Sequence, residues 1–399
     1  SANVRVISIS DLVPLEKHIK ATELITHILT TYHYKKTEIN DALSNVIFKN
    51  YFENLDQNKA YFINSDIQAF EKFRYTIDDA IIKSDISLAF EIFKQYRKRV
   101  EERINFALKI INYDFDFNID ESFRFDRRDD NWLNNISDLD ELWRKRVKND
   151  VLNLKLAGKN IDNIKKTLSD RYNRILSTTI QLDSNDVFQT FINAYTTSVE
   201  PHTAYFSPRI SENFDISMRL SLEGIGAVLR AESEYTQVVR IITGGPADLD
   251  GRLSADDRII SVGQNIDGEM IDVIGWRLDD VVDLIRGPKN SVLKLEVLPK
   301  DTGIEGPSKT ITLTREKIKL EEQDASSRII DIPKTNTRIG VIELPAFYID
   351  FAAQAEGQSD YKSTSRDVRK LIKSMVQEKI DGLIIDLRGN GGGSLSEAL

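Results

Sequence analysis

The spacing of apolar residues changes between Glu200 and Pro208, and this change limits how the chain can fold. Over residues 15–198, apolar residues recur at steps of three and four, which places them on one face of a helix. Pro201 and Pro208 then end the helical pattern, because proline disfavours helical geometry in the residue before it. Beyond them, short runs of alternating apolar and polar residues are typical of strands. The sequence therefore predicts a helical region over residues 1–208 and β-containing domains after it.

The segment around Trp143 illustrates the helical region. Leu139, Trp143 and Val147 share one helix face, with Asp138 placed to cap the start of the helix and Gly158 to end it. Helices of the same kind are expected over residues 15–32, 41–55, 65–82, 85–111, 162–178 and 185–199.

Composition narrows the classes of function. The 399 residues suggest two to four domains, and the net charge of −9 argues against a nucleic-acid partner, because phosphate binding needs clustered Lys and Arg. No apolar run approaches the roughly 18 residues that a membrane span needs. The absence of cysteine excludes disulfides and thiolate catalysis, and the four histidines lack metal-binding spacing. We therefore expect no metal, no cofactor, no nucleic-acid partner and no membrane span.

Residues 211–316 have the pattern of a small β-rich domain. Strands are expected within residues 237–242, 256–263, 291–299 and 309–314. Residues 278–286 form an amphipathic helix that Gly287 and Pro288 end. Just before this domain, the aromatic pair Tyr205 and Phe206 predicts a short strand.

A glycine pair near the start of this domain is the first candidate site. Gly224 and Gly226 flank Ile225, ahead of an apolar run that begins at Ala227. Glycine permits backbone conformations that other residues avoid, so successive N–H groups can turn toward one point and form an anion-binding nest. A peptide carboxylate fits such a nest, and the peptide can then add as a strand beside residues 227–229. The alternative is a tight turn between two strands that binds nothing.

Residues 317–399 predict the start of an α/β domain. A strand over residues 338–344, a helix over 360–377 and a strand over 383–387 form one crossover unit, and a glycine-rich loop, residues 388–393, follows. The loop lacks the Lys of a phosphate-binding P-loop, and Ser394 occupies the place of the third glycine of a dinucleotide motif. The remaining interpretation is an oxyanion hole, in which backbone N–H groups face a developing negative charge.

Several motifs together resemble one family. Residues 385–393 (IDLRGNGGG) look like the D-L-R-x-N-x-G-G signature of the C-terminal processing peptidases, and residues 200–205 (EPHTAY) and 279–282 (DDVV) agree with it. The β-rich domain resembles a PDZ domain of bacterial proteases through residues 224–227, 245–247 and 256–259, although Ala255-Asp256-Asp257 stands where relatives usually have Pro-Gly-Asp. The long helical region is similar to that of the larger, tail-specific members.

The resemblance implies a multidomain α+β fold and places the site residues. It implies a helical N-terminal platform over residues 1–208, a PDZ domain over 211–316 and an incomplete α/β, crotonase-like serine-protease core over 317–399. The peptide-binding residues would be Leu222, Gly224, Ile225, Gly226, Ala227, Val228, Val281, Leu284 and Ile285, and the last three could equally be core. Gly392 or Gly393 would donate to the oxyanion, with Asp386, Arg388 and Asn390 supporting the loop.

The family's catalytic Ser–Lys dyad matches nothing in this sequence and is expected beyond Leu399. Ser394 and Ser396 are better explained as N-cap residues than as nucleophiles. The chain is therefore expected to bind peptide without cleaving it. A core that ends here leaves the apolar side chains of Ile342, Leu344, Ile384 and Leu387 without partners, so we expect them to be covered by the helical region or by another copy, or to lie in poorly ordered chain.

As a whole, the resemblance implies a serine endopeptidase that recognises the apolar C-termini of protein substrates through its PDZ domain. It would degrade or trim proteins in the periplasm, its signal peptide removed, with a possible adaptor protein on the helical region. The alternative is a non-catalytic PDZ scaffold that binds peptides, which would have no use for residues 386–393.

Overall fold

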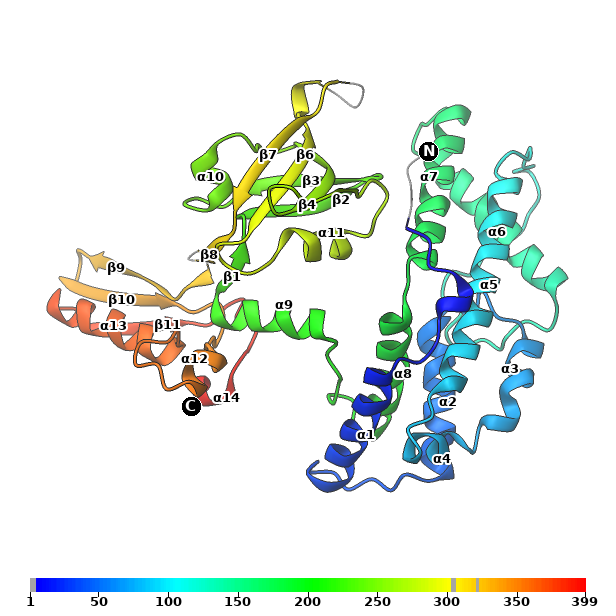
Figure 1. The fold of residues 1–399 in the computed structure, drawn as a ribbon, viewed down its shortest axis with the longest axis horizontal. Coiled ribbons are helices and arrows are strands. Elements are labelled where there is room, and N and C mark those ends of the chain that lie inside the picture. The colour runs from blue at the N-terminus through cyan, green and yellow to red at the C-terminus, as the bar shows by residue number, and fades with distance from the viewer. Residues whose placement is uncertain (1–4, 303–305, 321–322) are drawn as a thin grey trace. The chain divides into compact units, whose positions relative to one another are not determined.

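The computed structural model describes residues 5–302, 306–320 and 323–399 (Figure 1). The chain divides into two compact units. The first comprises Ser1–Ser207 with Gly275–Arg277, and the second Pro208–Ile274 with Leu278–Leu399.

The first unit is helical, as predicted. Its helices are α1 (Glu16–Thr31), α2 (Asp41–Leu55), α3 (Asn64–Phe70), α4 (Ile77–Ile82), α5 (Ser87–Ile110), α6 (Ile136–Leu156), α7 (Ile161–Ile180) and α8 (Ser184–Val199). The single helix expected over 65–82 is interrupted between α3 and α4 by a 3₁₀ turn, Glu71–Phe73. The cap prediction for α6 was wrong, because Asn135 caps the helix by accepting from the Asp138 N–H.

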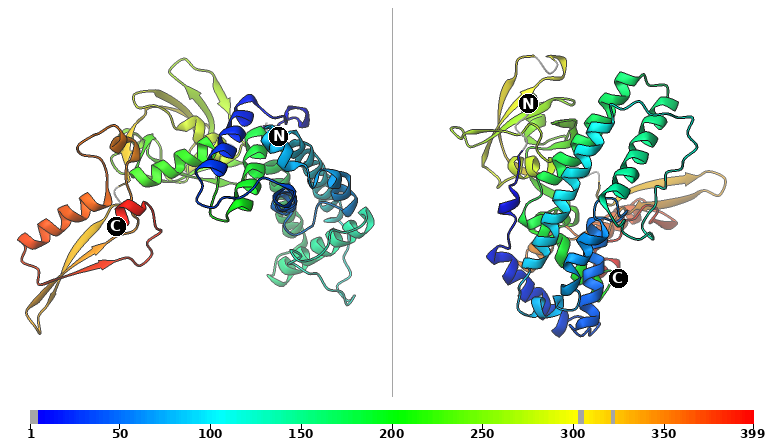
Figure 2. Two further views of the ribbon diagram at one scale, coloured as in Figure 1. Left: turned by 90° about the horizontal axis from the view of Figure 1, so that it is seen from below. Right: turned by 90° about the vertical axis from the view of Figure 1, so that its right-hand side faces the viewer.

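Two hydrophobic clusters hold this unit together, and α5 contributes to both. Phe90 and Phe93 in its first half pack with residues of α1, α2 and α8. Ile104 in its second half packs with Trp143 of α6 and Tyr172 of α7. The helices lie alongside one another in both views of Figure 2, so α5 is the element that connects the two clusters.

The second unit begins with a helix where the sequence predicted a strand. Residues 200–207 form no strand, and α9 (Pro208–Arg219) starts at Pro208. The fixed φ of proline suits the first turn of a helix, where its missing N–H costs no hydrogen bond. Pro208 therefore opens α9, whereas α8 already ends at Val199, before Pro201.

A six-stranded antiparallel sheet follows, with α11 close to β2 and β4 (Figure 1). The strand order is β2-β3-β4-β6-β7, with β5 beside β4. The elements are β2 (Ala227–Glu232), β3 (Tyr235–Ile241), α10 (Pro246–Asp250), β4 (Arg258–Gln264), β5 (Met270–Asp272), α11 (Leu278–Ile285), β6 (Val292–Leu298) and β7 (Lys309–Thr314). A separate ladder joins β1 (Ser221–Gly224) to β8 (Glu316–Lys319).

The C-terminal part forms the predicted strand–helix–strand unit. In a three-stranded sheet, β10 (Thr337–Glu343) pairs in parallel with β11 (Gly382–Asp386) and antiparallel with β9 (Ser326–Ile332). The helices are α12 (Phe351–Ala355), α13 (Thr364–Gln377) and α14 (Leu395–Ala398).

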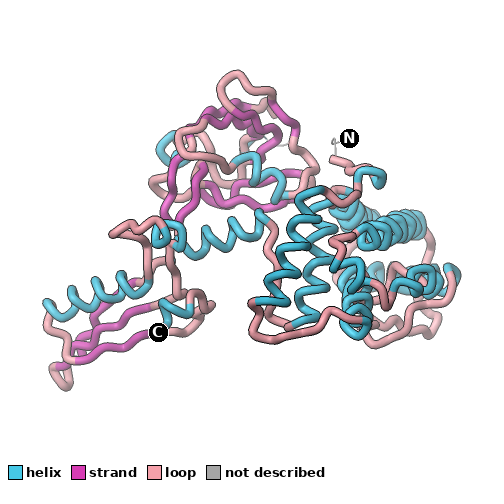
Figure 3. The backbone as a smooth tube through the Cα atoms, turned by 60° about the horizontal axis from the view of Figure 1, so that its bottom comes forward, coloured by secondary structure: helices cyan, strands magenta, loops and turns pink. Residues whose placement is uncertain are grey.

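In Figure 3, α13 covers one face of this sheet, and no helix among the described residues covers the other. Ile342 and Leu344 are buried, but Ile384 is 53% and Leu387 49% exposed. Within this single chain Ile384 and Leu387 are therefore uncovered, and their cover by another copy stays a prediction.

Candidate functional site

The loop between β1 and β2 requires glycine at position 226. Gly226 has φ +77°, a conformation that side chains disfavour, and a Cβ there would lie 3.2 Å from the Gly245 Cα. Space and backbone conformation therefore both exclude a larger residue.

This loop leaves two backbone donors available. The Ile225 carbonyl accepts from the Ala247 N–H (2.9 Å), and the Gly226 carbonyl accepts from the Ile242 N–H (2.8 Å). Among the described residues, the N–H groups of Ile225 and Gly226 have no acceptor. Two adjacent free N–H groups are the arrangement that an anion-binding nest needs.

Strand β2 is the edge of its sheet, and its open side begins next to this loop. Opposed residues in an antiparallel ladder alternate between hydrogen-bonded and non-bonded pairs. Because the neighbouring Gly226–Ile242 pair is bonded, the Ala227–Ile241 pair is not, so Ala227 directs its N–H and C=O away from β3. Within the described parts of the chain, no strand pairs with that side of β2. An added peptide strand would therefore find free backbone groups there.

Helix α11 lies near β2, with its apolar face against the sheet. Val281 is fully buried and Ile285 is 4% exposed, whereas Leu284 remains half-buried. Of the three predicted pocket residues, two are thus core and one is accessible. Half-buried Val282 lies on the apolar side of the helix, but it was not among the predicted pocket residues.

The other predicted residues of the loop and strand differ in burial. Gly224 and Ile225 are buried, while Leu222, Ala227 and Val228 are half-buried. A cavity of about 730 Å³ adjoins the start of the loop, lined in part by Leu222, Arg286 and Gly287.

The second glycine loop, residues 389–393, is fixed by a short ladder to residues 345–347. Gly391 donates its N–H to the Pro345 carbonyl (3.1 Å), and the Phe347 N–H donates to the Gly392 carbonyl (2.8 Å). Gly392 donates to the Asn390 Oδ1 (2.7 Å). Gly393 is then the residue of the 391–393 run whose N–H has no acceptor among the described residues.

The residues predicted to support this loop have different roles. Asn390 donates its side-chain N–H to the Leu344 carbonyl (2.8 Å) and so ties the loop to the end of β10. Arg388 is 87% exposed and pairs with Asp386 at 2.6 Å, and its guanidinium lowers the pKa of that carboxyl to about 2. Asn390 therefore holds the loop, whereas Arg388 lies toward solvent and Asp386 is largely covered (13% exposed).

The two serines after the loop have no base beside them. Ser394 is at the N-cap position of α14, but its hydroxyl bonds to the Ser396 hydroxyl (2.8 Å) and not to the helix backbone. The nearby Glu397 carboxylate accepts from Ser363 (2.8 Å). This geometry provides no activated nucleophile in the described C-terminal segment.

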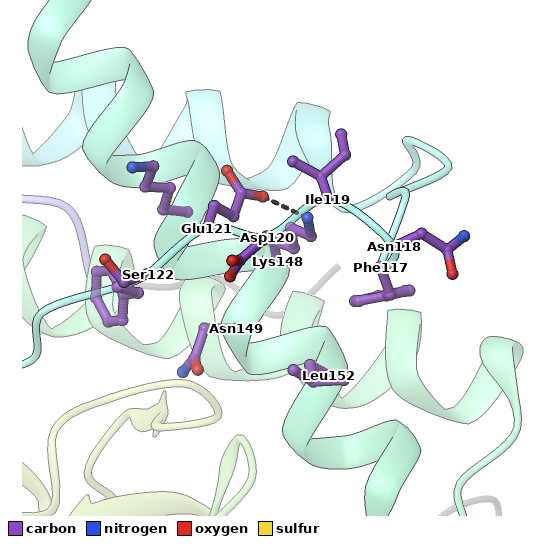
Figure 4. Close-up of a pocket in the computed structure, with 11 residues that line it drawn as sticks. Phe117, Asn118, Ile119, Asp120, Glu121, Ser122, Lys148, Asn149 and Leu152 are labelled. Carbon is purple, nitrogen blue, oxygen red and sulfur yellow. Dashed lines mark hydrogen bonds and ion pairs between the residues drawn. The ribbon is translucent and has the colours of Figure 1, made fainter.

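Sequence reasoning predicted no pocket in the helical unit, and Figure 4 shows one that the structure contains. It has a volume of about 280 Å³ and lies between residues 117–123 and α6. Glu121 forms ion pairs there with Arg144 and Lys148, whose hydrogen bonds lower its pKa to about 2. Glu121 and Lys148 of the pocket are therefore already paired with each other, and only the polar, aromatic composition of the loop could have indicated the pocket.

Over residues 5–302, 306–320 and 323–399, no cluster of three or more His, Asp or Glu side chains could hold a metal ion. None of the helices in the described chain is both long and apolar enough to cross a bilayer.

Three protein-family models match the chain in order. The tail-specific protease N-terminal domain matches residues 25–209, the PDZ domain residues 214–298, and peptidase family S41 residues 338–399. Together with the fold, these matches show a multidomain chain that is similar, segment by segment, to the PDZ-containing peptidases.

Individual relatives specify the class further. The tail-specific protease of Haemophilus influenzae is 37% identical over 380 residues, which are 95% of this chain and 52% of that protein. The carboxyl-terminal-processing protease of Synechocystis is 30% identical over 202 residues, 50% of this chain and 41% of that protein. The chain is therefore a relative of the tail-specific and C-terminal processing proteases, which confirms the resemblance seen in its motifs. It spans about half the length of the curated relatives it matches.

Solved structures give partial matches. The PDZ domain of a carboxy-terminal protease from Vibrio cholerae, in complex with peptide, is 52% identical, covering 25% of this chain and all of that one (TM-score 0.24). The photosystem II D1 C-terminal processing protease is 20% identical, covering 57% of this chain and 56% of that one (TM-score 0.27).

Proposed function

We propose that this chain captures the C-termini of protein substrates for a serine endopeptidase of the C-terminal processing type. The observation that carries the proposal is the pair of free N–H groups at Ile225 and Gly226, directly before the open edge of β2. A terminal carboxylate accepts from these donors, and the preceding residues of the substrate add to β2 as a strand. Leu284 and Val228 contact the last side chain, which favours apolar C-termini.

The second glycine loop supplies one side of the proposed active site. Gly393, in preference to Gly392, donates its N–H to the oxyanion that forms when the scissile carbonyl is attacked. The Ser–Lys dyad that attacks it lies outside residues 1–399, so this chain alone binds peptide without cleaving it.

The same proposal assigns a role to each part of the chain. Residues 1–208 form a platform that an adaptor protein can contact, residues 211–316 the PDZ domain, and residues 317–399 part of the protease core. The matched family segments support this division. The enzyme acts in the periplasm, where it degrades or trims proteins with apolar ends.

Peptide binding to the 399-residue chain tests the proposal. Fluorescence anisotropy is expected to show binding of a peptide that ends in an apolar residue with a free carboxylate, and at least tenfold weaker binding of the same peptide with an amidated end. Equal affinity for the two peptides, or no binding of either, would refute carboxylate capture.

Two glycine variants locate the binding site. Gly226→Ala should abolish the difference between free and amidated peptides, because the new Cβ displaces the loop. Gly251→Ala is the matched control, since Gly251 has φ +73° but open space around its Cβ position. Loss of binding in both variants would instead indicate a general effect of backbone strain.

The alternative function is a peptide-binding scaffold without catalysis. It is favoured by one observation, the lack of a base beside Ser394 and Ser396. A chain extended beyond Leu399 tests this alternative. The scaffold would be excluded if that chain cleaves a bound peptide and loses the activity when a serine downstream of Leu399 is replaced.

A further inference from the structure

Arg315, between β7 and β8, is a buried cation whose hydrogen bonds go to neutral groups. Its side chain is only 2% exposed, and no carboxylate within the described residues pairs with it. Its Nε donates to the Ile285 carbonyl (2.8 Å) and its Nη2 to the Leu284 carbonyl (2.9 Å). Both carbonyls belong to the last turn of α11, whose partial negative charge a cation stabilises.

The same guanidinium reaches two other parts of the domain. Nη2 also donates to Gln264 Oε1 (2.7 Å) at the end of β4. Nη1 donates to the Ser291 hydroxyl (3.0 Å) and the Val292 carbonyl (3.3 Å) at the start of β6. One side chain therefore ties the end of α11 to the sheet that α11 covers.

Gly287 allows this arrangement. A Cβ at Gly287 would lie 3.0 Å from both Cζ and Nε of Arg315. The sequence indicated Gly287 only as a helix stop, but the structure shows that it also leaves room for the guanidinium.

The residues around Arg315 also contact β1, the strand that leads into the loop at Ile225 and Gly226, the proposed carboxylate-binding loop. Glu316, the next residue, is opposite Gly224 in the β1–β8 ladder. Lys289, beyond the end of α11, donates its N–H to Glu223 (3.0 Å) and pairs with Glu316 (3.1 Å). The end of α11 and the start of the loop are thus fixed by the same small group of residues.

We propose that Arg315 is a positioning residue for peptide capture, because it fixes α11 at a set distance from the loop at Ile225 and Gly226 and so sets the spacing between α11 and the open edge of β2. This inference rests on the proposed function. A role in stability alone explains the residue less well, since well-packed apolar residues commonly replace buried ionic groups at no cost in stability. Lysine cannot reproduce the contacts, because its single ammonium group lacks the planar fork of donors.

Peptide affinity of Arg315 variants in the full 399-residue chain tests the inference. Arg315→Met is expected to bind the free-carboxylate peptide about tenfold more weakly than the original chain. Arg315→Lys is expected to restore little of this loss. Gln264→Leu removes one acceptor of Arg315 and one donor to the Leu284 carbonyl. It should weaken binding by a smaller factor, and it provides the test if Arg315→Met does not fold.

A matched variant separates positioning from stability. Ile311 is fully buried on β7 and contributes no hydrogen bond to α11. Ile311→Ala should lower the melting temperature while peptide affinity, measured well below that temperature, stays within twofold. Unchanged affinity in folded Arg315→Met or Gln264→Leu would overturn the inference and leave carboxylate capture intact. If the original chain fails to distinguish free from amidated peptide, the proposed function itself fails.

Discussion

Single residues determine the shape of both glycine loops. Gly226 and Gly393 each combine a positive φ with a close neighbour that excludes a side chain. At Gly393 the neighbour is the Phe347 carbonyl oxygen, only 2.3 Å from the position of a Cβ. The motif indicated glycine at these positions, but only the surrounding backbone shows why each is needed.

Gly393→Ala is therefore expected to disrupt the ladder between residues 391–394 and 345–347. Hydrogen exchange measured by mass spectrometry should show faster exchange of the Phe347 N–H, which bonds to the Gly392 carbonyl. Gly391→Ala is the control, because nothing lies within 4 Å of its Cβ position and its φ is not positive. Equal protection of Phe347 in the two variants would contradict this account.

His18 makes the helical unit sensitive to pH. Its Nδ1 accepts from the Leu15 N–H (3.2 Å), its Nε2 bonds to Asn185 Oδ1 (3.1 Å), and its ring stacks on Phe188 with centroids 4.6 Å apart. Burial lowers its pKa from the usual 6.5, with Asn185 opposing that shift.

The folded chain therefore binds fewer protons than the unfolded chain just below pH 6.5, and stability falls as the pH falls through that window. The melting temperature of the helical unit should drop between pH 7.5 and 5.5. His18→Gln should show a smaller drop, since glutamine does not titrate. The same pH dependence in both chains would exclude His18 as the cause.

At the scale of elements, α11 shows how much the sequence could predict. The amphipathic pattern identified the helix and Gly287 its end, but periodicity alone could not distinguish a groove-lining residue from a core residue. Val281 and Ile285 are buried and Leu284 is accessible because of how the helix is rotated over the sheet, which depends on distant contacts such as that of Arg315.

Leu284→Glu is expected to weaken binding of a peptide with an apolar end roughly tenfold. The reason is that a charged side chain would replace the apolar one proposed to contact the peptide's last residue. Leu156→Glu on α6 is the control, as Leu156 is 76% exposed and belongs to the helical unit. Isothermal titration calorimetry would measure both. An equal effect of the two substitutions would place the last side chain of the peptide elsewhere.

Other elements show the limit of local patterns. Tyr205 and Phe206 suggested a strand, yet the chain turns there and α9 follows, because Pro208 is a favourable first residue of a helix. The strand–helix–strand unit of the C-terminal part was predicted correctly, since long periodic segments and a continuous apolar strand are strong signals. The exposed side of β11 could not be predicted, because exposure depends on which other segments pack against the sheet.

At the scale of the molecule, the three-stranded sheet presents apolar side chains to solvent. Leu383, Ile384, Ile385 and Leu387 are each 39–53% exposed. Patches of this kind favour contact with other apolar surfaces.

We expect the 399-residue chain to self-associate at micromolar concentrations, and Ile384→Lys to reduce that association. Ile119→Lys is the control, because Ile119 is similarly exposed (57%) but lies in the helical unit. Sedimentation velocity would distinguish the chains. A chain that stays monomeric at all concentrations would show that the apolar patch does not drive self-association.

The long helix α5 has a consequence for how the helical unit melts. The two halves of α5 belong to different hydrophobic clusters. If either cluster unfolds, it therefore removes contacts that hold α5 against the other cluster. A substitution at Trp143 should therefore also destabilise the packing around Phe90. Heating should unfold both clusters in a single cooperative step, where two separate bundles would give two.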